Sequence, residues 1–325
     1  MENSSLKQEN ARGRVWLILA ISAAAGLGTV WIPVGLLIVP ALWAYAGARS
    51  KPAWMALPAA VYAVGALSFY TTVAAVGMIV CMAGAAFALY YMQTKRVSNT
   101  YTALTLAGVF LLGLYICVAL PGVLSGDGAF AAVQSVMDEM IDFYRAALSQ
   151  SGNADAEYIS LINEYLDAFS DAVPTYIVPV LCVSASVSGL GNLLFFRLFC
   201  RKHTEISLAP MRAFRYWTLP RSMMLGLLLM LVGSLVFEWS DWTFSDSLGN
   251  TVNVLVGMPL LLQGLCVVDF LLKRSNKNVT TLRAVVYTAI GVLFSIAQMP
   301  LILIGCFEQI FHFRNRAQAM PPRAG

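Results

Sequence analysis

Charged and amide side chains inside long apolar runs are the residues of this sequence best placed to carry chemistry. Asp269 lies near the end of one such run, four residues before Lys273, so the two could pair on one helix face. The other interpretation is a cation or proton site reached from the cytoplasm. A charge at the bilayer centre costs about 2.5 to 3.5 kcal/mol, so an ionisable residue there is a candidate functional residue. Glu308 and His312 are also four residues apart and would suit either an ordinary interfacial pair or half of a metal site.

Four amide side chains in similar apolar surroundings could bind a small solute: Asn192, Asn253, Gln263 and Gln298. Gln263 precedes Asp269 by six residues and Asn253 precedes it by sixteen, so helix geometry alone does not gather them into one ligand set. The side chains of Asn192 and Gln298 could instead form hydrogen bonds between helices. We predict a substrate-binding set of these four amides with Asp269, and no metal site.

The sequence holds no catalytic or nucleotide-binding motif. It has no glycine-rich loop ending in Lys followed by Ser or Thr, no histidine pair around a glutamate, and no serine between glycines at elbow spacing. If ATP drives the protein, another subunit binds it. We expect no cofactor, no catalytic residue and no enzyme activity, although intramembrane chemistry can use scattered residues.

The composition is that of a polytopic membrane protein. The chain is 59% hydrophobic and 12% charged, with a mean hydropathy of +0.71, whereas soluble proteins are about 25% charged. Its net charge of +4 is spread over short basic clusters between apolar runs, which are topology signals and not a nucleic-acid footprint. We therefore predict an all-α transmembrane bundle with the lipid bilayer as its partner and no nucleic acid. Its six cysteines are expected to be free thiols.

The apolar runs are long enough for about ten membrane segments, since each tilted helix needs about 20 residues. Residues 15–48 hold two with a turn near 29–33, and residues 52–94 hold two with the weakest point at 70–72. Single segments follow at 101–123, 173–199, 216–237 and 249–272. The last stretch, 284–313, is either one long kinked segment or two short ones, so nine segments is the alternative.

An acidic block interrupts these runs at 127–171, with nine acidic residues against Arg145 alone. Apolar residues recur there at three- and four-residue steps on both sides of a turn at 149–153, which predicts two amphipathic helices. We expect this hairpin to pack on the membrane surface or against neighbouring segments, with a partner-binding or gating lid as the alternative.

The basic clusters predict the topology. Both termini, the basic loop at 197–221 and the other clusters fall inside, whereas the hairpin and a small acidic turn at 238–246 fall outside. The divisions are a cytoplasmic tail (1–14), five membrane segments (15–123), the acidic extracytoplasmic hairpin (124–172), the C-terminal membrane segments (173–313) and a basic tail (314–325). The protein is expected in the bacterial cytoplasmic membrane.

Two short patterns carry a family resemblance. The run Phe-Arg-Tyr-Trp-Thr-Leu-Pro at 214–220, and the closing pattern Gly305, Glu308, Phe313 and Arg314, resemble features of the YybS-like family of bacterial predicted membrane proteins. Glu308 stands where that pattern has Asp. The resemblance covers most of the chain through the order of segments and the outer insert, and it implies an integral membrane protein with no established activity.

A second likeness is to the substrate-binding membrane subunits of energy-coupling-factor vitamin transporters. Those subunits dock a transmembrane coupling subunit through small residues at four-residue spacing on their first helix, and Ala20 and Ala24 have that spacing here. Internal packing would also explain the two alanines. The resemblance implies that Ala20 and Ala24 are helix-docking residues.

Three functions remain in competition. The first is a small-solute transporter or transporter-like substrate-binding subunit, with a polar cavity at mid-membrane depth. The second is a non-catalytic scaffold or assembly factor for cell-envelope proteins, which predicts an exposed apolar strip on the hairpin. The third, a membrane enzyme acting on lipid or cell-wall intermediates, requires acid, base and histidine side chains to converge.

Overall fold

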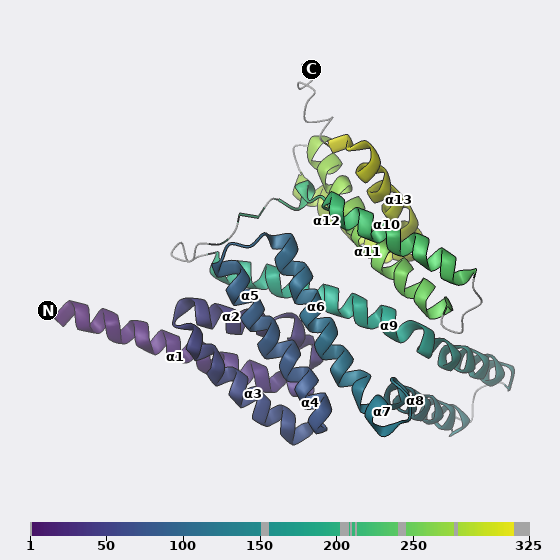
Figure 1. The fold of residues 1–325 in the computed structure, drawn as a ribbon, viewed down its shortest axis with the longest axis horizontal. Coiled ribbons are helices and arrows are strands. Elements are labelled where there is room, and N and C mark those ends of the chain that lie inside the picture. Colours follow the sequence, from purple (N-terminus) through teal and green to yellow (C-terminus); the bar gives the residue numbers. More distant parts are fainter. Residues whose placement is uncertain are drawn as a thin grey trace, which may run out of the picture. The chain divides into compact units, whose positions relative to one another are not determined.

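The computed structural model describes residues 2–150, 156–201, 208, 210, 211, 213–239, 245–275 and 279–314. All regular secondary structure in these residues is helical, which confirms the all-α prediction. The chain divides into two compact units, Met1–Ala209 (unit 1) and Pro210–Gly325 (unit 2). Figure 1 shows the helices of both units, coloured by their position in the sequence from purple at the N-terminus to yellow at the C-terminus.

Unit 1 contains nine α-helices and three short helical turns of other types among its described residues. They are α1 (Glu2–Trp31), η1 (Pro33–Leu37), α2 (Val39–Arg49), η2 (Pro52–Met55), α3 (Ala56–Phe69), α4 (Thr72–Ile79), η3 (Val80–Gly84), α5 (Ala85–Thr94), α6 (Asn99–Val118), α7 (Leu120–Ser125), α8 (Ala131–Gln150) and α9 (Ala156–Cys200).

Two breaks in the apolar runs fall where the sequence predicts them. The first run is interrupted between Trp31 and Pro33, at the junction of α1 and η1. The second is interrupted between Phe69 and Thr72, where the Thr71 side chain accepts a hydrogen bond from the backbone N–H of Ala74 and caps α4. Local capping and proline chemistry therefore explain both boundaries.

Small residues bring the helices of unit 1 together at backbone distance. A Cβ on Gly77 would collide with the backbone of Gly113 and Cys117 in α6, and a Cβ on Gly189 with the backbone of Ala107. Helix α6 therefore packs directly against both α4 and α9. The buried cluster around these contacts includes Ala41, Cys81, Ala85, Leu89, Leu106, Phe110, Leu193 and Phe196.

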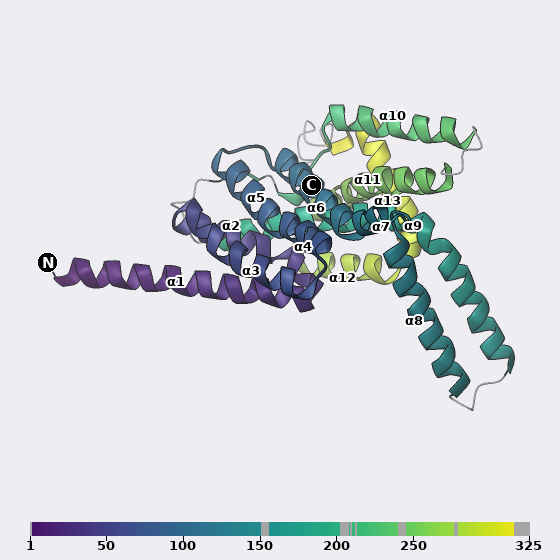
Figure 2. The same cartoon turned by 60° about the horizontal axis from the view of Figure 1, so that its bottom comes forward.

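The acidic block forms an antiparallel pair of helices, α8 and the first half of α9. Arg145 pairs with Asp167 across the two helices, and the Ser170 hydroxyl donates to Asp138 at 3.2 Å. Figure 2 shows this pair as an arm that leaves the rest of unit 1. The turn expected at 149–153 lies mostly outside the described residues.

Helix α9 differs from the sequence prediction because it does not stop before the expected membrane segment at residue 173. It continues as one helix of 45 residues through Pro174 and Pro179. A proline removes one backbone N–H and bends a helix without ending it, provided that neighbouring contacts hold the two halves. The second helix of the hairpin and the following membrane segment are thus a single element.

The described elements of unit 2 are η4 (Phe214–Tyr216), α10 (Arg221–Glu238), α11 (Ser245–Ser275), α12 (Val279–Val292) and α13 (Phe294–Phe311). A Cβ on Gly264 would collide with the carbonyl oxygen of Leu301, and one on Gly305 with that of Leu260. Helices α11 and α13 therefore cross in direct backbone contact. The last apolar stretch is two helices separated at Leu293, and Pro300 lies inside α13.

Six described helical stretches are long and apolar enough to cross a membrane: Pro52–Phe69, Thr72–Thr94, Asn99–Ser125, Glu157–Cys200, Leu248–Arg274 and Phe294–Phe311. Three shorter apolar helices lie at Trp16–Val30, Ser222–Phe237 and Thr280–Val292. The chain is therefore a multi-pass membrane protein. The count of ten segments, or nine, stays a prediction. Residues 240–244 of the acidic turn expected at 238–246, and residues 315–325 of the basic tail, lie outside the described residues.

Candidate functional site

Asn192 in α9 links three elements of unit 1 through its side-chain amide. Its Oδ1 accepts from the backbone N–H of Ala41 at 2.8 Å, and its Nδ2 donates to the carbonyl oxygens of Leu36 at 2.7 Å and Ser188 at 2.9 Å. Ala41 lies in the first turn of α2, whose N–H groups have no partner within the helix. The amide oxygen of Asn192 thus joins α2 to α9, and one amide hydrogen joins η1, while the bond to Ser188 stays within α9.

A second polar cluster in unit 1 was not predicted. The Arg197 guanidinium donates to Asn99 Oδ1 at 2.8 Å and to Gln93 Oε1 at 3.3 Å, and Gln93 Nε2 donates to Thr102 Oγ1 at 3.1 Å. Gln93 is fully buried. The sequence gives little signal for this burial because Gln93 stands two residues before Lys95, at the expected edge of a membrane segment.

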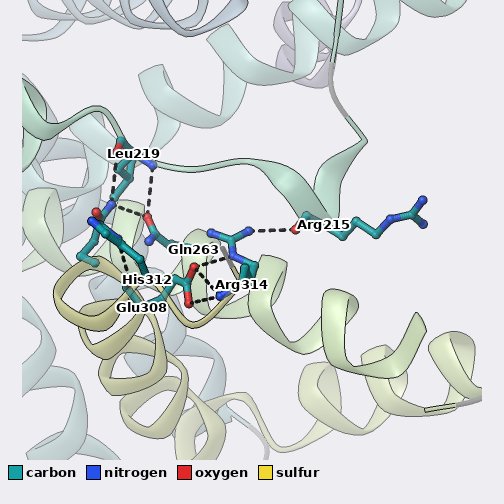
Figure 3. A network of polar contacts seen from close by, with 7 residues as sticks. Arg215, Leu219, Gln263, Glu308, His312 and Arg314 are labelled. Atoms are coloured by element: carbon teal, nitrogen blue, oxygen red, sulfur yellow. Dashed lines mark hydrogen bonds and ion pairs between the residues drawn. The ribbon is translucent and has the colours of Figure 1, made fainter. Parts of the chain in front are cut away.

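Gln263 in α11 is the buried centre of a polar network in unit 2. Its Oε1 accepts from Gln309 Nε2 at 2.7 Å and from the backbone N–H of Leu219 at 3.2 Å. Gln309 Nε2 also lies 3.4 Å from the carbonyl oxygen of Leu219. Figure 3 shows Gln263 between Leu219 and α13. The network holds the segment before α10 against α11 and α13.

Glu308 and Arg314 form a buried ion pair beside this network (Figure 3). Arg314 Nε donates to Glu308 Oε1 at 2.8 Å, and each residue is only 3% exposed. His312, the partner expected from the sequence, does not pair with the Glu308 carboxylate; its Nδ1 lies 3.2 Å from the Glu308 carbonyl oxygen. The physical reason is a left-handed backbone at His312, with a φ of 50°, which ends α13 and turns Arg314 back toward Glu308.

The same ion pair joins the two sequence patterns that carry the family resemblance. Arg314 Nη1 donates to the carbonyl oxygen of Arg215 at 2.8 Å, so the run at 214–220 meets the closing pattern 99 residues later in the chain. Gly305 of the closing pattern sits at the α11–α13 crossing, one helical turn from Glu308. The two patterns are therefore one structural site.

Asp269 in α11 pairs with Arg283 of α12, and not with Lys273 as the four-residue spacing suggested. Arg283 Nε lies 2.5 Å from Oδ1, and Nη2 donates to Oδ2 at 2.9 Å. The Asp269 side chain is 6% exposed, whereas that of Arg283 is 33% exposed. Lys273 is exposed, so its flexible side chain extends outward while the neighbouring helix supplies the cation.

One buried thiol in α11 lies within range of charges from both ion pairs of unit 2. Cys266, one turn before Asp269, is buried and lies within range of the charges of both Arg314 and Asp269. Among the described residues, no cluster of three or more His, Cys, Asp or Glu could hold a metal ion. The C-terminal half of α11 therefore carries a buried amide, thiol and carboxylate at three-residue steps, those of Gln263, Cys266 and Asp269.

The remaining predicted residues lie on outward faces. Asn253, Gln298, Ala20 and Ala24 are all exposed. The inward face of α1 is formed instead by Leu19, Ser22, Gly26 and Thr29. Within unit 2 the structure brings Gln263 together with Gln309, and Asp269 with Arg283, whereas Asn192 lies in unit 1. The five-residue solute-binding set stays a prediction.

A family model described as "Predicted membrane protein (DUF2232)" matches residues 17–308 of the chain. No curated protein matches the chain. No solved structure matches it either.

Proposed function

The chain belongs to the DUF2232 family of predicted membrane proteins, and we propose that it binds a small solute as a transporter or transporter-like substrate-binding subunit, with Asp269 and Arg283 at the centre of the site. The observation that carries the proposal is the burial of the Asp269 carboxylate in a membrane-spanning helix beside a cation that is one-third exposed. Ionisable groups at such positions are expensive and commonly mark ion or substrate pathways.

Stability alone is a weak reason for such a pair. The free energy that two buried charges gain from each other is largely offset by the loss of their hydration, so an apolar pair of similar volume is often as stable. The pair is more readily understood as a binding site in which a cation or proton replaces Arg283 as the partner of Asp269. A cation or proton that neutralises Asp269 releases Arg283, whose guanidinium can then hold a carboxylate or phosphate of the solute.

The other polar residues predicted to bind the solute have different surroundings. Gln263 is held by Leu219 and Gln309 and forms a fixed wall on the same helix. Asn192 fixes the start of α2 in unit 1. Asn253 and Gln298 are on outward faces, so they would contact solute only where another element covers them.

The resemblance to energy-coupling-factor subunits supplies a specific form of the proposal. A membrane-embedded coupling subunit would dock on Ala20 and Ala24, and both are exposed on the outward face of α1. Small side chains allow such close helix contact where lipid provides no hydrophobic drive. In this form the protein resides in the bacterial cytoplasmic membrane with both termini inside, in agreement with its basic clusters and its resemblance to YybS-like proteins.

The test is purification in mild detergent from native membranes, followed by mass spectrometry of every bound metabolite and protein. We expect one small molecule with the wild type and with Asp138→Asn, a control that removes an acid from the arm. Asp269→Asn should lower its occupancy about tenfold, equivalent to about 1.4 kcal/mol. The double variant Asp269→Asn/Arg283→Gln, which leaves no unpaired charge, separates lost binding from lost folding. Unchanged occupancy in a folded double variant would refute the site.

A non-catalytic scaffold or assembly factor is the alternative function. The observation in its favour is the set of exposed apolar side chains on the arm, such as Phe143 and Tyr165. A cell-envelope protein that copurifies reproducibly, is lost on Phe143→Ser or Tyr165→Ser, and comes without any small molecule would favour the scaffold over the transporter.

A further inference from the structure

The arm, formed by α8 and residues 156–173 of α9, has one apolar face that no described part of unit 1 covers. The face consists of Met140 and Phe143 on α8, and Tyr158, Leu161, Tyr165 and Phe169 on α9, all of them exposed. Phe143 is 70% exposed and Tyr165 is 67% exposed. Spacings of three and four residues place each group on one stripe of its helix.

The two stripes lie on the same side of the arm. Buried Ile141 in α8 and half-buried Leu166 in α9 mark the sides of the two helices that face each other. Measured from these two residues, both exposed stripes are displaced by roughly 60° to 160° in the same rotational sense. Because the helices are antiparallel, displacement in the same sense brings both stripes to one face. The opposite face is polar, where Arg145 contacts Asp142 of its own helix and Asp167 of α9.

The stripe on α9 continues into the part of the helix that crosses the membrane. Beyond Phe169 the same helical positions are occupied by Tyr176, Val180, Val187 and Leu194, all exposed and none charged. A helix of 45 residues is about 67 Å long, more than twice the roughly 30 Å hydrocarbon thickness of a bilayer. About half of α9 therefore lies beyond the hydrocarbon, yet it presents the same apolar stripe.

The chain changes direction at two places where the arm joins the membrane segments, namely the turn before α8 and the proline pair within α9. Helix α7 ends in a tight turn at Gly126 and Gly128, which have φ values of 84° and 109° that favour glycine. Extending the pairing of Asp138 with Ser170 places the start of α8 beside α9 between Pro174 and Pro179. The glycine turn and the proline pair therefore lie at one level, and Figure 2 shows the arm leaning away from the bundle there.

We propose that the lipid bilayer covers this face, and that the arm lies along the membrane surface with its tyrosines and phenylalanines in the headgroup region. Tyrosine suits this region because its ring is apolar and its hydroxyl stays hydrated. The acidic face then points to water, where its carboxylates are hydrated. The stripe is continuous with the exposed apolar side of the membrane part of α9. This continuity favours lipid over a protein partner, because a single apolar stripe then contacts lipid along its whole length.

Site-specific photocrosslinking tests the proposal in the full-length protein. Tyr165→p-benzoylphenylalanine and Phe143→p-benzoylphenylalanine keep an aromatic ring on the apolar face, whereas the same replacement at Glu164 or Asp142 places the probe on the polar side. After irradiation in native membranes, and after reconstitution in phosphatidylcholine vesicles, mass spectrometry identifies what each probe has captured.

We expect lipid adducts at positions 165 and 143 at least several-fold above those at 164 and 142, in both preparations. Crosslinks to another protein or to a second copy of this chain, in place of lipid, would overturn the proposal. Equal and low lipid capture at all four positions would overturn it as well, because the face would then stand in water. Two independent probe positions on the face ensure that misfolding of one variant does not decide the outcome.

Discussion

Replacing one member of the Glu308–Arg314 pair should be far more damaging than replacing both. The pair lies 2.8 Å apart at the end of α13, and each residue is 3% exposed. Glu308→Met leaves the Arg314 guanidinium buried with no counterion. Arg314→Met leaves the Glu308 carboxylate in the same position. Methionine is unbranched and of similar length, so in the double variant the space is filled and no charge is stranded.

The magnitude follows from the cost of an uncompensated buried charge. Removing one partner of a buried ion pair typically costs about 3 to 5 kcal/mol, whereas replacing both by apolar residues of similar volume is often nearly neutral. Arg314 also donates to the Arg215 carbonyl oxygen, so Arg314→Met loses that hydrogen bond as well, about 1 kcal/mol. We therefore expect each single variant to lose at least about 3 kcal/mol, and a coupling free energy of at least about 2 kcal/mol between the two sites.

The assay is reversible unfolding in mixed micelles by titration with sodium dodecyl sulfate, followed by far-ultraviolet circular dichroism. Asp142→Asn is the control, because it removes a carboxylate that is 75% exposed from an ion pair at 3.7 Å, and we expect a change below about 1 kcal/mol. A loss below about 1 kcal/mol for Glu308→Met, or a double variant as unstable as the sum of the two single variants, would refute the assignment of Glu308 and Arg314 as a coupled buried pair.

Two further substitutions test packing and hydrogen bonding in the two units. Gly305→Ala forces a Cβ against the carbonyl oxygen of Leu260 and should lower the free energy of unfolding by about 1 to 3 kcal/mol, whereas Gly291→Ala, with open space around it, should be neutral or slightly stabilising in the same titration. Asn192→Leu removes the hydrogen bonds to Ala41 in α2, Leu36 in η1 and Ser188 in α9, and should cost about 2 to 4 kcal/mol. Asn253→Leu on an outward face should change stability by less than about 0.5 kcal/mol; equal effects would show that Asn192 has no structural role.

Much of the fold could be predicted because it depends on local sequence. The apolar composition identifies a multi-pass membrane protein, and the helix breaks at 31–33 and 69–72 coincide with Pro33 and the capping Thr71. The amphipathic pattern of the acidic block indicates two helices, and the structure contains them as α8 and the start of α9. The sequence analysis divided this stretch before residue 173, whereas α9 runs on without interruption through Pro174 and Pro179.

The candidate site was predictable only in part. Asp269, Gln263 and Asn192 were singled out because polar groups in apolar runs are rare, and all three are buried and hydrogen-bonded or ion-paired in the structure. Their partners were not predictable from spacing along one helix. Arg283 reaches Asp269 from the next helix, and Ala41 is 151 residues from Asn192.

The sequence by itself determined which segments are helical and which of them can enter a bilayer, because composition, periodicity and capping act over a few neighbouring residues. Only the tertiary structure decided which charges pair. Arg314 reaches Glu308 through the left-handed turn at His312, and Asp269 pairs with Arg283 of the following helix, α12. An ion pair forms between groups that helix packing brings within a few ångströms of one another. Their spacing along the sequence does not determine this distance.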